Sequence, residues 1–308
     1  MSLVHAPLDC AVAPARRGAV AVLGNLDGVH LGHQALIGEA RALAAEAGAP
    51  LAAVTFAPHP RRAFDPDTPP FLLTTLEQKA AILEGLGCHD VFALPFTPAL
   101  YGLLPEAFVA DILVGVLGLS GVVVGDDFRF GAKRAGDADA LARTGAAHGL
   151  AVRALGVAGD AARKYSSTTA REALREGRPQ DAAAVMGRPF AVTGAVLTGR
   201  KLARQLDFPT ANVALGDLVR PLYGVYGIEA DADGATYPGI ANVGVRPTVD
   251  GETELLEAHL FGFDGDLYGR TITVRLERFI RPERRFDGVE DLRAQIARDV
   301  ETASALTS

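Results

Sequence analysis

Apolar and polar residues follow two different periodicities along this chain, and the first occupies residues 19 to about 155. There, short apolar runs alternate with segments whose apolar residues recur at helical spacing. Strands alternating with helices are typical of βα units around a parallel sheet with helices on its faces. The predicted strands are AVAVLG (19–24), LAAVTF (51–56), VFALPF (91–96), VVVG (122–125) and AVRAL (151–155).

Two helices of this α/β part have recognisable ends. The first is predicted to follow His33 and to stop at Gly48, because glycine enters the left-handed conformation that ends a helix at little cost. The second is predicted to open with Thr74 and Glu77 as a capping box and to close at Gly87.

After Gly187 the pattern changes to alternation. It is clearest in RTITVRLERF (270–279), where Ile272, Val274 and Leu276 share one face and the residues between them are polar, as in a half-buried antiparallel strand. Asp233 and Gly234 form a hairpin-type dipeptide, and the several short strands between 190 and 280 predict a small closed barrel. The last segment, 288–306, predicts a helix packed on that barrel, with an apolar stripe of Val289, Leu292, Ile296 and Val300.

The length of 308 residues favours two domains, since single domains usually have about 100–200 residues. The pattern changes between the helical segment 179–187 and the strand that begins at Phe190. We therefore predict an α/β domain over 1–187 and an antiparallel β-barrel domain with a C-terminal helix over 188–308.

Charge and composition limit the classes of partner. A net charge of −7 and a pI near 5.5 give no general attraction to nucleic acid or to an anionic membrane, so phosphate binding must be local. The apolar stretch 112–125 is interrupted by glycines and is too short for a membrane span, and the N-terminus lacks a signal-peptide pattern. Cys10 and Cys88 have no disulfide or zinc spacing, which fits a cytoplasmic protein.

The strongest candidate site is GNLDGVHLGH (24–33), at the turn between the first predicted strand and the first helix. Ligands of α/β folds bind at such turns. Its glycines let the backbone approach a phosphate, the helix N-terminus offers N–H groups, and His30 and His33 add imidazole donors. This segment predicts a cradle for the phosphates of a nucleotide, with Gly24, Asn25, Asp27 and Gly32 among the binding residues.

The HLGH sequence resembles the HxGH signature of nucleotidyltransferases related to class I aminoacyl-tRNA synthetases. The longer GNLDGVHLGHQALI resembles the first motif of prokaryotic bifunctional riboflavin kinase/FMN adenylyltransferases. Further segments of the same family follow in order: TFAPHP (55–60), VGDDFRFG (124–131) and SSTTAR (166–171). The resemblance implies a Rossmann-like nucleotidyltransferase domain that transfers an adenylyl group from ATP.

SSTTAR also has a physical interpretation. Ser166, Ser167 and Thr168 can cap a helix, and Arg171 one turn later can present its guanidinium to phosphate oxygens. The resemblance makes this the second ATP-binding motif, although a helix cap alone would use the same residues. It also implies flavin or nucleotide contacts at His59, Asp127 and Phe128, where a proline-fixed loop or a turn-forming aspartate is the structural alternative.

The second domain continues the resemblance with DFPTANV (207–213), GVY (224–226), NVGVRPT (242–248), LEAHL (256–260), DLYG (266–269) and FIRPERRF (279–286). The family's PTAN motif implies that Pro209 lies at the ATP site and that Thr210 and Asn212 hold Mg²⁺ and ATP phosphates; oxygen ligands suit this hard cation. Glu257 is implied as the general base of the kinase. Arg281 is a candidate for a flavin-side loop or for a solvated charged turn.

One stretch departs from the family pattern. Before PTAN the kinases favour glycines in the phosphate-facing loop, whereas this chain has Gly199, then Ala203 and Asp207. A Cβ restricts the backbone, and a carboxylate near phosphate is unfavourable. The sequence alone thus leaves open an adenylyltransferase with an impaired kinase barrel.

The main hypothesis is a two-step synthesis with ATP as co-substrate: riboflavin to FMN in the barrel, then FMN to FAD in the α/β domain. A relative of aminoacyl-tRNA synthetases and a non-catalytic flavin-binding regulatory protein are the alternatives. The expected partners are riboflavin, FMN, FAD and ATP, without nucleic acid or membrane, and the sequence does not predict the oligomeric state.

Overall fold

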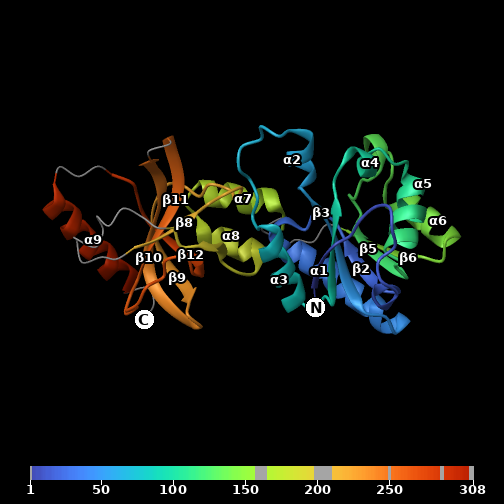
Figure 1. Ribbon diagram of the computed structural model, residues 1–308, viewed down its shortest axis with the longest axis horizontal. Coiled ribbons are helices and arrows are strands. Elements are labelled where there is room, and N and C mark those ends of the chain that lie inside the picture. The colour runs from blue at the N-terminus through green and yellow to red at the C-terminus, as the bar shows by residue number, and fades with distance from the viewer. Residues whose placement is uncertain (1, 157–164, 198–209, 249–250, 285–287, 305–308) are drawn as a thin grey trace. The chain divides into compact units, whose positions relative to one another are not determined.

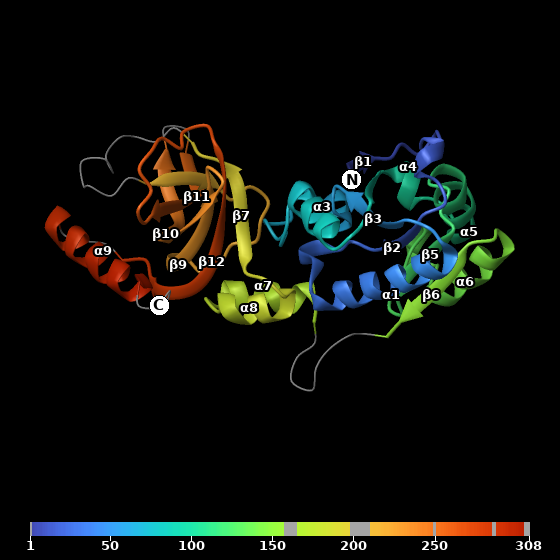
Figure 2. The same ribbon diagram turned by 90° about the horizontal axis from the view of Figure 1, so that it is seen from below.

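The computed structural model describes residues 2–156, 165–197, 210–248, 251–284 and 288–304 (Figures 1 and 2). The chain forms two compact units. Residues 1–69 and 74–166 make the first unit, and residues 70–73 and 167–308 make the second.

The first unit contains a six-stranded sheet in which each pair of neighbouring strands is parallel, as predicted. The strand order is β1-β4-β3-β2-β5-β6. The strands are β1 (Ser2–His5), β2 (Val20–Leu23), β3 (Leu51–Ala57), β4 (Asp90–Pro95), β5 (Gly121–Gly125) and β6 (Ala151–Leu155). Five correspond to predicted strands; β1, an edge strand paired with β4, is additional.

Helices pack on both faces of this sheet, and neighbouring residues of β2 point to opposite faces. Val20 and Val22 pack with α1 (Leu31–Ala47) and α3 (Leu76–Gly85), whereas Ala21 and Leu23 pack with the π-helix η3 (Phe108–Val116) and α6 (Ala138–Ala147). The shorter helices are η1 (Pro14–Arg16), η2 (Asp27–Val29), α2 (Pro60–Phe64), α4 (Pro98–Tyr101), α5 (Pro105–Ala107) and η4 (Ala132–Arg134).

Both predicted helix starts need correction. The first helix begins at Leu31, before His33, because the His30 side chain caps it by accepting a hydrogen bond from the His33 backbone N–H. The second begins after Thr75, whose capping box is completed by Gln78. Thr74 is instead bound to the turn that follows β2. The predicted ends are confirmed, since Gly48 and Gly87 have φ values of +61° and +86°.

The second unit contains an antiparallel sheet that closes into a barrel, as predicted. Its strand order is β7-β12-β9-β10-β11-β8, and a bridge between Leu197 and Asn212 joins the two ends of this order. The predicted hairpin is present, because Asp233 and Gly234 both have positive φ between β9 and β10. The strands are β7 (Phe190–Ala195), β8 (Ala211–Ala214), β9 (Gly224–Ala232), β10 (Ala235–Thr248), β11 (Gly251–Leu260) and β12 (Thr271–Pro282).

In the part of the barrel unit that the structure describes, the helices are α7 (Ser167–Arg175), α8 (Pro179–Met186) and α9 (Val289–Ser304). Helices α7 and α8 contribute Leu174, Val185 and Met186 to the main barrel core. Helix α9 is the predicted C-terminal helix, and Ile296 and Val300 pack against a smaller apolar cluster; the side chains of Val289 and Leu292 lie outside the described residues.

Packing divides the chain between 166 and 167, whereas the change of sequence pattern lies at 187/188. The division into domains 1–187 and 188–308 therefore stays a prediction about which residues serve each activity. In the described residues, no helix is both long enough and apolar enough to cross a membrane.

Candidate functional site

The first candidate site lies where the parallel strands end. The chain runs from β2 outward to β3 and β4, then returns to the other side of β2 as β5, so the order reverses between β2 and β5. Ligands of open α/β sheets bind at the carboxyl ends of strands at such a reversal. The turn Gly24–His30 follows β2, and Asp127 follows β5.

The turn after β2 has an unusual backbone. Leu26, Gly28 and Val29 all have positive φ, at 50°, 78° and 39°. Gly28 accepts this at little cost, whereas a β-branched residue such as Val29 rarely does. Leu26 and Val29 are fully buried, so packing fixes the turn from below.

His30 and His33 are close together, as predicted. Their rings stack with centroids 3.6 Å apart, and His30 Nδ1 accepts the His33 backbone N–H at 3.3 Å. An accepting Nδ1 carries no proton, so in neutral His30 the proton is on Nε2. His30 Nε2 is therefore a hydrogen-bond donor at the N-terminus of α1, where the helix dipole also favours an anion.

Gly32 makes this ring position possible. A Cβ at Gly32 would lie 3.0 Å from the His30 ring and 3.2 Å from the Tyr165 carbonyl oxygen. Both distances are tighter than ordinary contacts. Contacts with His30 and Tyr165 therefore favour glycine at position 32. At Gly24 an added Cβ would lie 3.5 Å from the nearest atom, which is an ordinary contact.

Asp27 and Asn25 hold the turn to its surroundings. Asp27 is 1% exposed, and its carboxylate accepts the Thr74 backbone N–H at 3.2 Å, while Thr74 Oγ1 accepts the Gly28 N–H at 3.2 Å. The Asn25 carbonyl accepts from Thr55 Oγ1 at 3.0 Å. In the structure, these two predicted binding residues therefore act on the shape of the turn.

The other predicted contacts of this unit lie on neighbouring loops. His59 is half-buried and caps α2, its Nδ1 accepting the Arg61 N–H at 3.1 Å. Asp127 is exposed just after β5, and Phe128 stacks on Phe130 with centroids 5.6 Å apart. A ligand role for His59, Asp127 and Phe128 remains a prediction.

An aromatic cluster near the ends of β3 and β4 was missed by the sequence analysis. Phe96 contacts Phe56, Phe64 and Tyr101, with ring centroids 5.4–5.5 Å apart. Phe64 is 65% exposed, which is high for a large apolar side chain. The signal was present in the aromatic residues after both strands, but only the sheet order shows that they meet.

The second ATP-binding motif is divided by the unit boundary. Ser166 ends the first unit, and α7 begins at Ser167 in the second, so Thr168 lies in its first turn. Arg171 is half-buried; its Nε donates to the Phe71 carbonyl at 2.7 Å, and its guanidinium lies 5.5 Å from the centre of the Phe71 ring. The expected helix is confirmed.

The second candidate site is a row of polar residues across three barrel strands. Glu257 of β11 is paired with Asn212 of β8 on one side and with Asn242 of β10 on the other. Their neighbours Leu256, Ala258 and Val213 point into the core. Because side chains alternate along a strand, the three polar residues share the outer face of the barrel.

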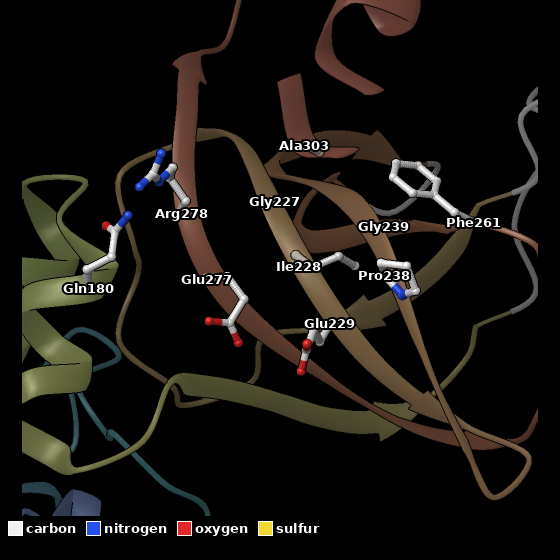
Figure 3. A pocket seen from close by; sticks show the side chains of 10 residues that line it. All are labelled: Gln180, Gly227, Ile228, Glu229, Pro238, Gly239, Phe261, Glu277, Arg278 and Ala303. Carbon is white, nitrogen blue, oxygen red and sulfur yellow. The ribbon is translucent and has the colours of Figure 1, made fainter. Parts of the chain in front are cut away.

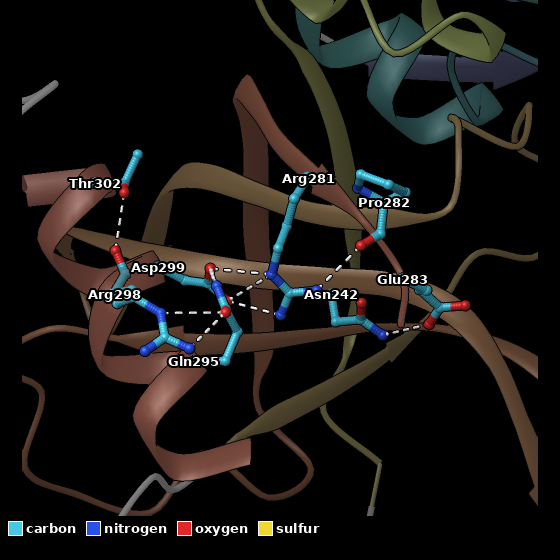
Figure 4. Close-up of polar contacts among 8 residues, drawn as sticks. All are labelled: Asn242, Arg281, Pro282, Glu283, Gln295, Arg298, Asp299 and Thr302. Atoms are coloured by element: carbon cyan, nitrogen blue, oxygen red, sulfur yellow. Dashed lines mark hydrogen bonds and ion pairs between the residues drawn. The ribbon is translucent and has the colours of Figure 1, made fainter. Parts of the chain in front are cut away.

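Glu257 is only 11% exposed, and both of its carboxylate oxygens accept hydrogen bonds from Arg246. This ion pair raises the pKa of Arg246. In the same row, Asn242 Nδ2 donates to Glu283 at 2.8 Å (Figure 4). Arg246 and Asn242 had no predicted role, because cross-strand partners cannot be read from the sequence.

Asn212 has a buried polar atom that the described protein residues do not satisfy. Its side-chain oxygen is buried and, within the described part of the chain, accepts no hydrogen bond. A buried acceptor without a partner is unfavourable by about 1–3 kcal/mol, so such atoms usually have a functional explanation. Thr210 is half-buried two residues earlier; Pro209, Ala203 and Asp207 lie outside the described residues.

Arg281 occupies a half-buried position on strand β12, whereas the sequence suggests a loop or a charged turn at this residue. Its guanidinium is bound to Asp299 of α9 at 2.7–3.0 Å and donates to the Pro282 carbonyl at 3.0 Å (Figure 4). Gln295 also donates to Asp299. These contacts attach α9 to the barrel, and a flavin contact of Arg281 remains a prediction.

A pocket of about 300 Å³ opens on the outer face of the same barrel (Figure 3). Its charged lining residues include Glu229 and Glu277, together with Arg278. Burial, and then the nearby charge of Glu229, raise the pKa of Glu277. Two carboxylates repel phosphate, so this pocket is a poor site for the phosphates of ATP.

Two family models match the chain in tandem. One, described as FAD synthetase, matches residues 12–169, and the other, described as riboflavin kinase, matches residues 186–307. The first covers the turn with both histidines and the second covers the polar row of the barrel.

Curated relatives match over nearly their whole length. A bifunctional riboflavin kinase/FMN adenylyltransferase from Pseudomonas fluorescens is 45% identical, over 96% of this chain and 95% of the relative. The protein of the same name from Escherichia coli K12 is 39% identical over 98% and 97%. A crystal structure from Streptococcus pneumoniae, named a macrolide-efflux protein, has a TM-score of 0.86 at 28% identity, covering 98% of both chains. Its name differs from that of the curated relatives, and its fold is shared.

Proposed function

This chain belongs to the bifunctional riboflavin kinase/FMN adenylyltransferase family, and we propose that the turn at 24–33 and the polar row at Glu257 carry its two reactions. The protein is a transferase that phosphorylates riboflavin to FMN and adenylylates FMN to FAD, each time with ATP. The observation that carries this function is the presence of both family models, in tandem, on a chain covered almost completely by bifunctional relatives.

In the adenylyl transfer, a phosphate oxygen of FMN attacks the α-phosphorus of ATP and pyrophosphate leaves. The nucleophile is already charged, so the protein has to align two anions and stabilise the leaving group. His30 Nε2, the N–H groups at the start of α1, and His33 suit the phosphates, and Arg171 is the proposed guanidinium donor. No covalent enzyme intermediate is needed.

The flavin ring needs an apolar, planar partner in this half-reaction. The exposed Phe64, with Phe96 and Tyr101 packed around it, supplies aromatic faces beside the strand ends. We assign this cluster to the isoalloxazine ring, with Phe128 as a further contact. His59 then orders the α2 segment that carries Phe64.

In the kinase reaction, the terminal ribityl hydroxyl of riboflavin attacks the γ-phosphorus of ATP and ADP leaves. Glu257 is the proposed general base that takes the hydroxyl proton. Its two hydrogen bonds from Arg246 hold the carboxylate in place on the outer face of the barrel. Arg246 is 57% exposed, so its side chain has room to move when riboflavin approaches Glu257.

The residues present also suit Mg²⁺. The buried Asn212 oxygen, which has no hydrogen-bond partner among the described residues, and the Thr210 hydroxyl are hard oxygen ligands of the kind that this cation prefers. A bound Mg²⁺ would neutralise charge on the ATP phosphates. Asn212 lies opposite Glu257 in the strand register, so metal ligand and base would flank the same reacting group.

Two wider assignments complete the proposal. Residues 1–187 would serve adenylylation and 188–308 phosphorylation, in agreement with the ranges of the family models. A cytoplasmic location agrees with the free state of Cys10 and Cys88, since a reducing compartment leaves such thiols unpaired.

The direct test supplies riboflavin, ATP and Mg²⁺ and separates FMN, FAD, ADP and pyrophosphate. We expect His30→Ala and His33→Ala to accumulate FMN without FAD, and Glu257→Gln to form FAD only when FMN is supplied. Glu301→Gln, an exposed change on α9, is the control with both activities intact. Equal loss of both reactions in a folded variant would contradict separate sites.

Two other functions have their own tests. Binding of flavin without ATP consumption would support a non-catalytic regulatory protein, and retention of RNA on a filter would support a relative of aminoacyl-tRNA synthetases. The family assignment favours neither.

A further inference from the structure

A buried lysine lies directly beneath the turn after β2. Lys79, in the first half of α3, is 4% exposed. Lysine is almost never so buried unless paired, because removing its charge from water is unfavourable. Burial lowers the pKa of Lys79 to about 8, while the charge of Asp27 acts in the opposite direction.

The ammonium group holds one backbone carbonyl. Lys79 Nζ donates to the Asn25 oxygen at 2.7 Å and to Thr55 Oγ1 at 3.1 Å. Thr55 Oγ1 in turn donates to the same Asn25 oxygen at 3.0 Å. The peptide group between Asn25 and Leu26 is therefore fixed by donors from α3 and from β3.

The turn needs such support because its backbone is strained. A non-glycine residue with positive φ is unfavourable by roughly 1–2 kcal/mol, and both Leu26 and Val29 are of this kind. Thr74, two residues before α3, adds a second attachment, since it binds both Asp27 and Gly28. Lys79 of α3 and Thr74 together thus hold the turn that leads into His30.

We propose that Lys79 is a positioning residue for FMN adenylylation: its buried ammonium fixes the turn through Asn25 and adds positive charge below the phosphate cradle. This rests on the proposed placement of adenylylation at residues 24–33. Lys79 acts through Asn25 and need not touch the substrate. In the protein interior a cation acts more strongly on nearby phosphates than it does in water.

A purely structural role of Lys79 would lead to a different experimental result. An apolar residue of similar length would remove the desolvation cost of the buried amine, so stability alone does not require lysine here. A lysine kept only for packing would therefore change the unfolding temperature and leave the rate per folded molecule unaltered.

The test compares Lys79→Met with the wild-type full-length chain. We expect kcat for FAD formation from FMN to fall about 100-fold, the effect of a misplaced catalytic turn, with KM for FMN changed less than about threefold. Riboflavin phosphorylation in the same chain should be unchanged. Lys79→Arg keeps a charged donor, so its kcat should be about tenfold higher than that of Lys79→Met. Glu77→Gln, an exposed change on the same helix, should leave kcat unchanged.

A folded Lys79→Met chain with wild-type kcat for adenylylation would overturn the proposal, as would an equal loss of riboflavin phosphorylation. If Lys79→Met does not fold, Thr55→Val decides. It removes the hydrogen bond that Nζ donates to Thr55 Oγ1 and the one that Thr55 Oγ1 donates to the Asn25 oxygen, and we expect at least about a fivefold loss of adenylylation, since one such hydrogen bond is worth about 1 kcal/mol. An unchanged rate overturns the role. The His30→Ala variant distinguishes an error in the proposed adenylylation site from an error in the role of Lys79. If it too keeps wild-type adenylylation, the proposed site is wrong; if it loses adenylylation while Lys79→Met does not, only the role of Lys79 is wrong.

Discussion

His30 combines a structural and a ligand-facing function in one ring. Its Nδ1 accepts a backbone N–H and starts α1, which leaves Nε2 as the donor on the other side of the ring. A residue that could cap but not donate, such as aspartate, would keep the helix and lose the phosphate contact. Histidine suits this position because one ring nitrogen can cap the helix while the other donates a hydrogen bond.

Gly32→Ala tests whether the position of the His30 ring matters. The added methyl group would lie 3.0 Å from that ring, so the ring must move by a few tenths of an ångström. We expect adenylylation to fall about 10- to 100-fold while riboflavin phosphorylation is unchanged. The matched control is Gly38→Ala in the same helix, where nothing lies within 4 Å. It should stabilise the protein by about 0.5–1 kcal/mol in denaturant unfolding and leave both rates intact.

Asn212→Leu should separate stability from activity in the barrel. Removing a buried oxygen that has no hydrogen-bond partner in the described residues should raise the free energy of unfolding by about 1 kcal/mol. Riboflavin phosphorylation should be lost and FAD formation from FMN retained. Ala214→Leu, exposed on the same strand, is the control with normal kinase activity. A less stable Asn212→Leu protein would contradict the inference that the buried Asn212 oxygen lowers the free energy of unfolding.

The proximity of site residues was predictable where the residue type is unusual for its place. Two histidines in a glycine turn indicate a ligand, and the pair is stacked in the structure, while its contact with a ligand stays a prediction. Lys79 gave no signal, because a lysine in a helix is normally solvated. Asn242 and Arg246 lie in the segment NVGVRPT that carries the family resemblance, but their pairing with Glu257 and Glu283 is seen only in the structure.

At the level of elements, the periodicity predicted most strands but not all boundaries. The alternation over 270–279 became β12, with Ile272, Val274 and Leu276 at most 1% exposed. The short β1 carries too few residues for a periodic signal. Capping was displaced from Thr74 to Thr75, because both residues can cap and only the tertiary contact with Gly28 decides between them.

The pairing of β9 with β12 gives a pH-dependent contribution to stability. Hydrogen bonds from Arg275 lower the pKa of Asp231 to about 2, and Asp231 also accepts from Thr236. A lowered folded-state pKa stabilises the fold above the ordinary value near 4, and this contribution disappears as the pH falls through about 2.

Asp231→Asn should therefore lower the free energy of unfolding by about 0.5–1 kcal/mol at pH 7, a small value because the Asp231 side chain is 48% exposed. The difference from wild type should shrink between pH 4 and pH 2, measured by urea unfolding across that range. Glu301→Gln is the control, with a change within about 0.5 kcal/mol. A difference that grew towards pH 2 would have the wrong sign.

At the level of the whole molecule, the two-part organisation was predictable because the hydrophobic period changes once along the chain. The position of the packing boundary was not. Helices α7 and α8 look like a continuation of the α/β pattern, yet their buried side chains belong to the barrel core. The segment 70–73 also belongs to the barrel unit, and no local pattern marks it.

Fragments should reveal this packing. Leu174, Val185 and Met186 each stabilise the barrel by about 1.5–3 kcal/mol when buried, and together they approach the stability of a whole domain. We expect fragment 167–308 to unfold cooperatively in urea and fragment 188–308 to lack a cooperative transition, followed by circular dichroism. Equal cooperativity of the two fragments would show that α7 and α8 are dispensable.

The short segment 70–73 also constrains how such a protein can evolve. Leu72 bridges to Leu218, and the Phe71 and Leu72 N–H groups both donate to the Asp217 carbonyl, although the residues on either side of the segment belong to the other unit. A single crossover between two parental genes near codon 167 would give a chimera whose barrel comes from one parent and whose 70–73 partner comes from the other. Shuffling the kinase half between distant relatives therefore needs two exchanged blocks.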